Sequence, residues 1–230
     1  MTNTHDFQAR LEALTREQQA LFDNRNEALP QDNGIFKRWR DPVVTADHVP
    51  LNWRYDLNQA TNPYLMERLG INGAFNAGAI HFEGDHVLVL RVEGHDRKSW
   101  FACAGSDNGV DGFKFWPRPI EMPETEDPDT NIYDMRLTEH EDGHIYGLFC
   151  TERKDQTRPD DPTAAIAKCG IARTRDLVSW ERLPDLQTRS EQQRNVVLHP
   201  EFINGKYAFY TRPQDGFIDT GKGGGIAFGY

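Results

Sequence analysis

A segment of one shape occurs three times in this chain: a polar start, a glycine turn, then an apolar stretch that ends at or near an arginine. The copies cover residues 81–91, 140–153 and 201–212. Their turn glycines lie about sixty residues apart, at Gly84, Gly143 and Gly205. A repeat of this length, with a tight turn between apolar strands, is typical of β-propeller blades. The repeat therefore predicts an all-β fold whose site lies on the central axis.

Each copy is expected to hold an inner strand before the glycine, a second strand after it, and a third strand that ends in a polar turn. Asp-Gly and Asn-Gly pairs at 142–143 and 204–205 supply the positive φ angles that tight β turns need. Two aromatic residues, Phe115 and Trp180, follow the first two third strands and are expected to pack against neighbouring blades. Three blades cannot close a ring, so we expect this chain to stop short of a complete propeller.

Two segments precede the repeats. Residues 4–24 are expected to form an amphipathic helix. Its apolar side chains near a single face are Phe7, Leu11, Leu14, Leu21 and Phe22. This helix either packs across the β domain or reaches another subunit. Residues 25–72 are punctuated by Pro, Asn and Asp and are expected to wrap irregularly onto the domain. The chain is therefore divided into a helical extension, 1–28, and a partial β-propeller domain, 29–230.

Composition narrows the classes of function. The formal charge of −10 argues against a nucleic acid partner, which requires basic patches. No apolar run approaches the length of a membrane span, and the N-terminus has no secretory signal. The cysteines, Cys103, Cys150 and Cys169, are scattered in apolar strands and are expected to be buried free thiols. We therefore expect a reducing, cytoplasmic compartment.

The candidate site comes from aligning the three copies on their glycines. About eight to eleven residues before each glycine, the inner strands begin at Asn76, at Asp134 and at the pair Arg194-Asn195. Inner strands line the axis of a propeller, so these side chains are expected to converge on one cavity.

Each apolar second strand ends in an arginine, which is a costly place for a charge without a partner. The three are Arg91, Arg153 and Arg212. Either each arginine pairs with a carboxylate of a neighbouring blade and fixes the ring, or the three serve the axial site.

The other two copies of the repeat have no Asp or Glu at the position that corresponds to Asp134. It is either a general acid or the partner of Arg136 in a structural ion pair, and strand alternation does not decide between these. Ordinary glycosidases need two carboxylates. One acid among several arginines instead suits an anionic nucleophile such as phosphate, which arginine binds bidentately. The acidic connector at 121–131 is expected to be a solvated face rather than a metal site.

Several motifs resemble glycoside hydrolase family 130, the β-mannoside phosphorylases, from about residue 30 to the last residue. They are GAFNAGA at 73–79, YDMRLT at 133–138, YGLFCTER at 146–153, NVVLHPEF at 195–202 and YTRPQD at 210–215. The resemblance implies a five-bladed β-propeller, of which about three blades are present. It also implies inverting phosphorolysis of 4-O-β-D-mannosyl-D-glucose to α-D-mannose 1-phosphate and glucose. Inorganic phosphate would be the co-substrate, with no metal or organic cofactor, in a homo-oligomer.

The same resemblance assigns roles to residues. Asp134 would be the general acid, its proton travelling through the 3-hydroxyl of the mannosyl unit. Asn76, Arg91 and Asp107 would bind the mannosyl unit. Arg194, Asn195 and Arg212 would bind phosphate.

Other functions stay open at this point. One is a β-mannoside hydrolase, or a phosphorylase that uses another acceptor sugar. Another is an inactive carbohydrate-binding fragment, which the missing blades favour. Members of the family run well beyond this chain, so we expect a truncated gene product or a ring completed by another chain.

Overall fold

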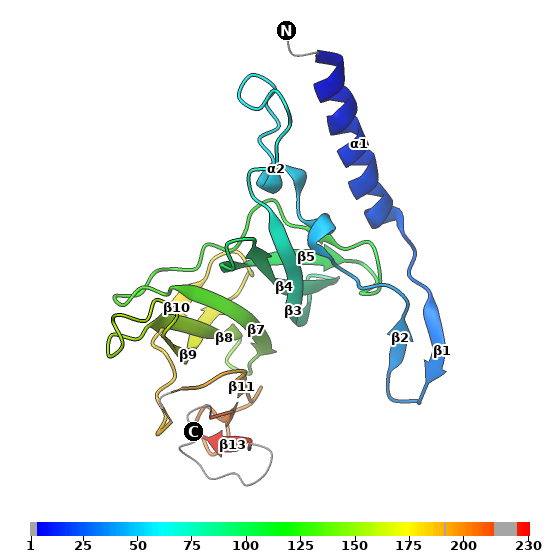
Figure 1. Cartoon of the computed structure of the whole chain (residues 1–230). Helices are drawn as coiled ribbons and strands as arrows, with labels where there is room; N and C mark the ends of the chain where they lie inside the picture. Colours follow the sequence, from blue (N-terminus) through cyan, green and yellow to red (C-terminus); the bar gives the residue numbers. More distant parts are fainter. Residues whose placement is uncertain (1–3, 191, 214–224) are drawn as a thin grey trace.

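The repeated glycine turns build a series of antiparallel sheets along the chain (Figure 1). A computed structural model describes residues 4–190, 192–213 and 225–230. The first repeated sheet has the order β3 (Ile71–Phe82), β4 (Asp85–Gly94), β5 (Ser99–Ser106), β6 (Lys114–Phe115). The second has the order β7 (Asn131–Glu139), β8 (Ile145–Lys154), β9 (Ala165–Thr174), β10 (Glu181–Leu183). The third contains β11 (Val197–Leu198), β12 (Phe209–Thr211) and β13 (Ala227–Gly229).

Each sheet is a meander in which consecutive strands pair with one another. The turn between its first two strands holds a glycine in the left-handed region, with φ of 97° at Gly84, 80° at Gly143 and 73° at Gly205. The predicted all-β fold and the predicted role of these glycines are therefore confirmed. The sheets are open rather than closed into a ring.

The main core lies between the first and second sheets. Val89 and Phe101 of the first sheet meet Met135, Phe149 and Trp180 of the second. The inner strands approach closely, because a Cβ added at Gly78 would lie 2.8 Å from the Met135 carbonyl oxygen. Trp180 therefore packs between sheets, as the sequence predicts.

Phe115 does not pack against a neighbouring blade. It lies on the opposite face of the first sheet, where its ring meets Trp53 edge-on at 5.7 Å between centroids. Trp53 belongs to the segment before the repeats, which covers this face of the sheet with Val44 and Val49. The segment before the repeats therefore covers the face of the first sheet on which the sequence predicts a neighbouring blade.

The N-terminal helix packs on that same segment. Helix α1 (Thr4–Asp23) lies beside η1 (Ala46–His48) and α2 (Leu51–Arg54) (Figure 1). Phe7 is buried, Gln18 Nε2 donates to the Val49 carbonyl at 2.9 Å, and Arg10 Nη1 donates to the Tyr64 carbonyl at 2.7 Å. Of the two alternatives, packing on the same chain is thus observed.

A hairpin of β1 (Ala28–Asp32) and β2 (Lys37–Trp39) interrupts the segment that the sequence predicts to be irregular. It projects away from the sheets (Figure 1). Within the described residues, no helix is both long and apolar enough to cross a membrane.

Arg153 lies in a buried network of carboxylates at the end of β8. Its guanidinium contacts Asp129 at 2.9 Å and Asp127 at 3.3 Å, and it also pairs with Asp185. Arg182 contacts Asp185 at 2.6 Å in the same network. The connector is exposed along most of its length, as predicted, and this includes Asp127, whose side chain is 74% exposed. Asp129 departs from the prediction, since its side chain is 14% exposed and ties the connector to the second sheet. Arg153 has the structural role that the sequence analysis left as one alternative.

We expect Arg153→Ala to destabilise the chain by about 3 kcal/mol, because it leaves buried carboxylates without their counter-charge. Arg158 is the matched control, since it contacts Asp155 at 3.0 Å but its side chain is 58% exposed. Arg158→Ala should cost less than about 1 kcal/mol. Urea unfolding at neutral pH measures both free energies, and equal losses would contradict a structural role specific to Arg153.

A second cluster joins the second sheet to the third at the hairpin end. Asp142 accepts hydrogen bonds from the hydroxyls of Tyr146 and Tyr207, each at 2.8 Å, and from the backbone N–H of His144 at 3.0 Å. Burial by itself would raise the pKa of Asp142, but these hydrogen bonds outweigh it and hold the pKa well below its usual range. The ionised carboxylate of Asp142 therefore stabilises the contact between the second and third sheets.

Because the pKa of Asp142 is lower in the folded than in the unfolded chain, its contribution is present above about pH 4 and is lost as the pH falls further. Asp142→Asn should cost about 1–3 kcal/mol at pH 7. The difference in unfolding free energy between the two proteins should shrink below about pH 4. Denaturant titrations between about pH 3 and 7 check this, and a difference that is constant with pH would refute it.

Candidate active site

A polar residue in the left-handed region lies in each of the inner strands β3 and β7 and just before β11, the inner strand of the third sheet. These residues are Asn76 with φ of 49°, Asp134 with φ of 58°, and Asn195 with φ of 54°. In β3 and β7 the pairing register shifts at this residue, so each strand carries a bulge there. Such a kink re-aims the side chain of the bulged residue. The sequence analysis did not predict the kink. Its signal was the recurrence of Asn or Asp at this place in each repeat, because these residues tolerate positive φ angles.

The kinks of the first two sheets bring Asn76, Asp134 and Arg91 together. Strand β7 lies beside both β3 and β11. Asn76 Nδ2 donates to Asp134 Oδ1 at 3.0 Å, and Arg91 Nη1 lies 3.2 Å from the same oxygen. The ion partner of Asp134 is thus Arg91 of the neighbouring sheet, and not Arg136, whose Nη1 donates to the Met135 carbonyl at 3.4 Å.

Arg91 is fixed on all sides. Its guanidinium carbon lies 4.8 Å from the ring centroids of Phe75 and of Tyr133. Its Nε donates to Ser99 Oγ at 3.0 Å, and its second amino group pairs with Glu93. This cation is therefore held rigidly beside Asp134 by rings and by ion pairs.

Glu93 lies behind Arg91 and is 4% exposed. Burial opposes its ionisation, but hydrogen bonds from Asn72 and Arg91, with the charges of Arg91 and Arg97, hold the pKa of Glu93 below its usual range. Glu93 is therefore a permanent counter-charge for Arg91.

Arg194 and Asn195 approach the second sheet from the third. Arg194 Nη2 lies 3.5 Å from Glu152 Oε1, and the backbone N–H of Asn195 donates to the Cys150 thiol. Arg194 Nε and Asn195 Oδ1 are buried yet have no hydrogen-bond partner among the described residues. Buried polar atoms without partners are costly, so this pair is suited to receive a polar ligand.

Arg212 occupies the position in the third sheet that Arg91 occupies in the first. In the first sheet, Arg91 pairs with Phe75, the residue before the kinked Asn76. In the third sheet, Arg212 lies between two paired residues, Tyr210 opposite Val197 and Pro213 opposite Gln193, and therefore faces residues 194–195. In the second sheet Tyr133 pairs with Cys150, which stands seven residues after its turn glycine, as the two arginines do. The predicted equivalence of Arg153 with the other two arginines is therefore wrong.

Asp107 is not brought to this cluster. It lies in an exposed turn directly after β5, next to Ser106, which pairs with His86 at the end of that strand. Arg91 pairs with Phe101, near the beginning of β5. Ser106 and Phe101 are five residues apart, which corresponds to roughly 17 Å along the strand. The predicted contact of Asp107 with the sugar has no support from the fold.

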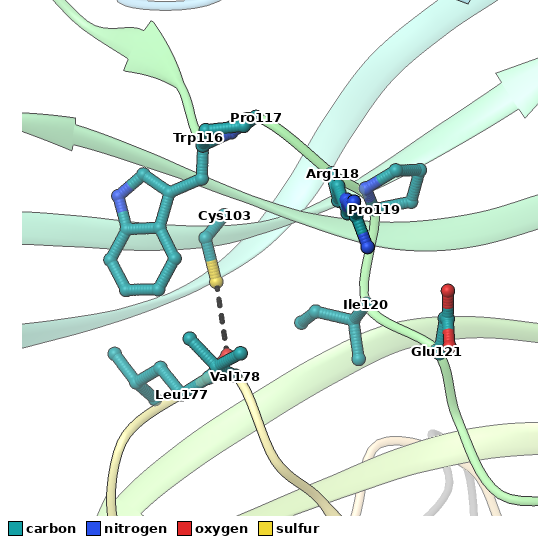
Figure 2. Close-up of a pocket in the computed structure, with 9 residues that line it drawn as sticks. All are labelled: Cys103, Trp116, Pro117, Arg118, Pro119, Ile120, Glu121, Leu177 and Val178. Carbon is teal, nitrogen blue, oxygen red and sulfur yellow. Dashed lines mark hydrogen bonds between the residues drawn. The ribbon is translucent and has the colours of Figure 1, made fainter.

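The cavity in Figure 2 lies apart from the polar cluster, between the first sheet and the loop before β10. It has a volume of about 340 Å³ and is lined by Trp116, Ile120 and Leu177 among others. The Cys103 thiol at its base donates to the Leu177 carbonyl at 3.7 Å, and burial raises the pKa of this thiol to about 12. All three cysteines are buried and free, as predicted. The thiol is thus unreactive, and Glu121 is the one carboxylate among the residues that line the cavity.

Within the described ranges, no cluster of three or more His, Cys, Asp or Glu side chains is arranged to bind a metal ion. The candidate active site is therefore the set of kinked positions and their cations, centred on Asp134.

The kink itself is testable at Asn76. Asn76→Gly and Asn76→Ala both remove the hydrogen bond to Asp134, but only alanine keeps a Cβ that opposes a positive φ. Asn76→Gly should be more stable than Asn76→Ala by about 0.5–1 kcal/mol. The control is Ala79→Gly, at an exposed position in a regularly paired part of β3. There the variant with glycine should be less stable than the protein with alanine. Thermal unfolding gives the order, and the same order at both positions would refute the kink.

Comparison with known proteins identifies a relative along nearly the whole chain. No family model matches the sequence. The chain is 58% identical over 223 residues to 4-O-β-D-mannosyl-D-glucose phosphorylase of Bacteroides fragilis, which covers 96% of this chain and 57% of that protein. The chain thus spans a little over half of the curated relative that it matches.

Two solved structures share the fold. One is β-1,2-mannobiose phosphorylase of Listeria innocua in complex with β-1,2-mannobiose, with a TM-score of 0.54 and 18% identity, over 71% of this chain and 57% of that one. The other comes from work on glycoside hydrolases within the GH130 family of mannoside phosphorylases, with a TM-score of 0.54 and 16% identity, over 88% and 60% of the two chains. The curated relative confirms the resemblance to the β-mannoside phosphorylases that the motifs predict, and the two solved structures show that the fold is shared.

Proposed function

We propose that this chain is the part of an inverting β-mannoside phosphorylase that carries the general acid. The substrates are 4-O-β-D-mannosyl-D-glucose and inorganic phosphate. The observation that carries the proposal is the position of Asp134, a carboxylate on a kinked inner strand that contacts Asn76 and the fixed cation of Arg91. The 58% identity to a mannosyl-glucose phosphorylase supports the choice of substrate.

The carboxylates near Asp134 are already committed to other groups. Glu93 is buried behind Arg91, and Glu152 accepts from the Tyr133 hydroxyl at 2.7 Å and faces Arg194. Neither stands at a kinked position, so the site, as far as the described residues form it, offers one acid rather than the pair that a hydrolase of the ordinary kind requires. A reaction that needs a single acid and an anionic nucleophile fits this arrangement.

In the proposed reaction, a phosphate oxygen attacks the anomeric carbon of the mannosyl unit while the glycosidic C–O bond breaks. The leaving glucose oxygen takes up the proton that originates at Asp134, and the products are α-D-mannose 1-phosphate and glucose. Arg194, Asn195 and Arg212 hold the phosphate, whose charge matches their donors. Asn76 and Arg91 hold the mannosyl unit. The reaction needs no metal or organic cofactor.

We further propose that the three open sheets are blades of a five-bladed propeller, with the remaining part of the ring corresponding to the rest of the curated relative. Assembly into a homo-oligomer and a cytoplasmic location remain predictions from the sequence.

Asp134→Asn tests the proposal, because the amide keeps the shape and the contacts but has no proton to give. Phosphate-dependent release of glucose from mannosyl-glucose should fall by a factor of about 10²–10⁴. Asp142→Asn is the matched control, since the Asp142 side chain is 17% exposed against 15% for Asp134 and lies in the hairpin cluster. It should stay within about twofold of the wild type below its unfolding temperature.

Two results would overturn the proposal. One is release of glucose that is as fast without phosphate as with it, which would favour a β-mannoside hydrolase. The other is an Asp134→Asn variant as active as the Asp142→Asn control.

A further inference from the structure

Tyr133 contacts both halves of the candidate active site. It stands next to Asp134 in β7, is 8% exposed, and pairs in register with Cys150. Its ring faces Arg91 of the first sheet, and its hydroxyl faces Glu152, which pairs with Arg194 of the third sheet. Tyr133 is not among the site residues that the sequence predicts.

The ring of Tyr133 supports the cation that contacts the acid. The Arg91 guanidinium carbon lies 4.8 Å from the centroid of this ring and 4.8 Å from that of the Phe75 ring. A guanidinium in contact with two aromatic rings has less freedom to rotate than one in contact with a single ring. Loss of one ring would free Arg91 from its position beside Asp134.

The hydroxyl of Tyr133 supports a second cation through a carboxylate. It donates to Glu152 Oε1 at 2.7 Å, and Arg194 Nη2 lies 3.5 Å from the same oxygen. The Glu152 side chain is 24% exposed and that of Arg194 is 40% exposed, so neither is held by burial alone. The hydrogen bond from a buried tyrosine therefore fixes the carboxylate against which Arg194 is placed.

We infer that Tyr133 is a positioning residue that acts on both substrates, through its ring on Arg91 at the sugar side and through its hydroxyl and Glu152 on Arg194 at the phosphate side. The inference rests on the proposed function for the identity of the two substrates. It assigns separate effects to two parts of one side chain, so the two can be removed one at a time.

Tyr133→Phe removes the hydroxyl and keeps the ring. The KM for inorganic phosphate should rise about fivefold, as one lost hydrogen bond to a charged group implies, while the KM for mannosyl-glucose and kcat change less than about twofold. Tyr133→Leu removes both parts and should also lower kcat/KM for the disaccharide at saturating phosphate. Glu152→Gln should reproduce the phosphate effect alone, because it removes the charge that faces Arg194.

Tyr146→Phe is the matched control. Tyr146 is also a buried tyrosine whose hydroxyl donates to a carboxylate, Asp142, at 2.8 Å, but it lies in the hairpin cluster. Its KM values should both stay within about twofold of the wild type. A second readout needs no turnover: the NMR order parameter of the Arg194 Nε–H group should fall in Tyr133→Phe and stay unchanged in Tyr146→Phe.

The outcomes separate the inference from the proposed function. Glucose release that is as fast without phosphate as with it refutes the proposed function, and the order parameter of Arg194 then decides the positioning role by itself. A Tyr133→Phe variant with an unchanged order parameter, or with an unchanged KM for phosphate in an active enzyme, overturns the inference. Equal rises in both KM values would also overturn it, because they indicate a general structural role.

Discussion

The arrangement depends on a backbone constraint that recurs in or just before each inner strand, a non-glycine residue held at positive φ. Asn76, Asp134 and Asn195 occupy this place in successive sheets. A left-handed residue is unfavourable in a strand, and Asn and Asp reduce that cost. The kink interrupts the alternation of side chains and aims a polar group between neighbouring sheets, where the apolar core would otherwise continue. The same device thus provides an acid in one sheet and amides in the other two.

Arginines have two different tasks in this fold, and their distance from the turn glycine separates them. Arg91 and Arg212 stand seven residues after Gly84 and Gly205, opposite the kinked residues. Arg153 stands ten residues after Gly143, where it neutralises the aspartates of a connector. Cys150 takes the equivalent place in the second sheet.

Repeated local patterns made much of this architecture predictable from the sequence. The turn glycines, the inner strands and the position of Asp134 follow from the repeat, because tight turns and strand alternation are local properties. The partners of charged side chains were not predictable in the same way. Asp134 was paired with Arg136 in one hypothesis, yet its partner Arg91 is 43 residues away. The place of Asp107 and the network of Arg153 also depend on register and on contacts between sheets, which no short motif encodes.

The second sheet lies between the other two, and its inner strand meets both. Asp134 faces the first sheet, while Tyr133 and Glu152 link that contact to Arg194 of the third. In the proposed reaction, Asp134 acts with phosphate as the nucleophile. NMR of a mixture of the protein, mannosyl-glucose and inorganic phosphate tests this directly. We expect α-D-mannose 1-phosphate as the first mannosyl product, and free mannose formed at the same rate with or without phosphate would overturn the proposed reaction.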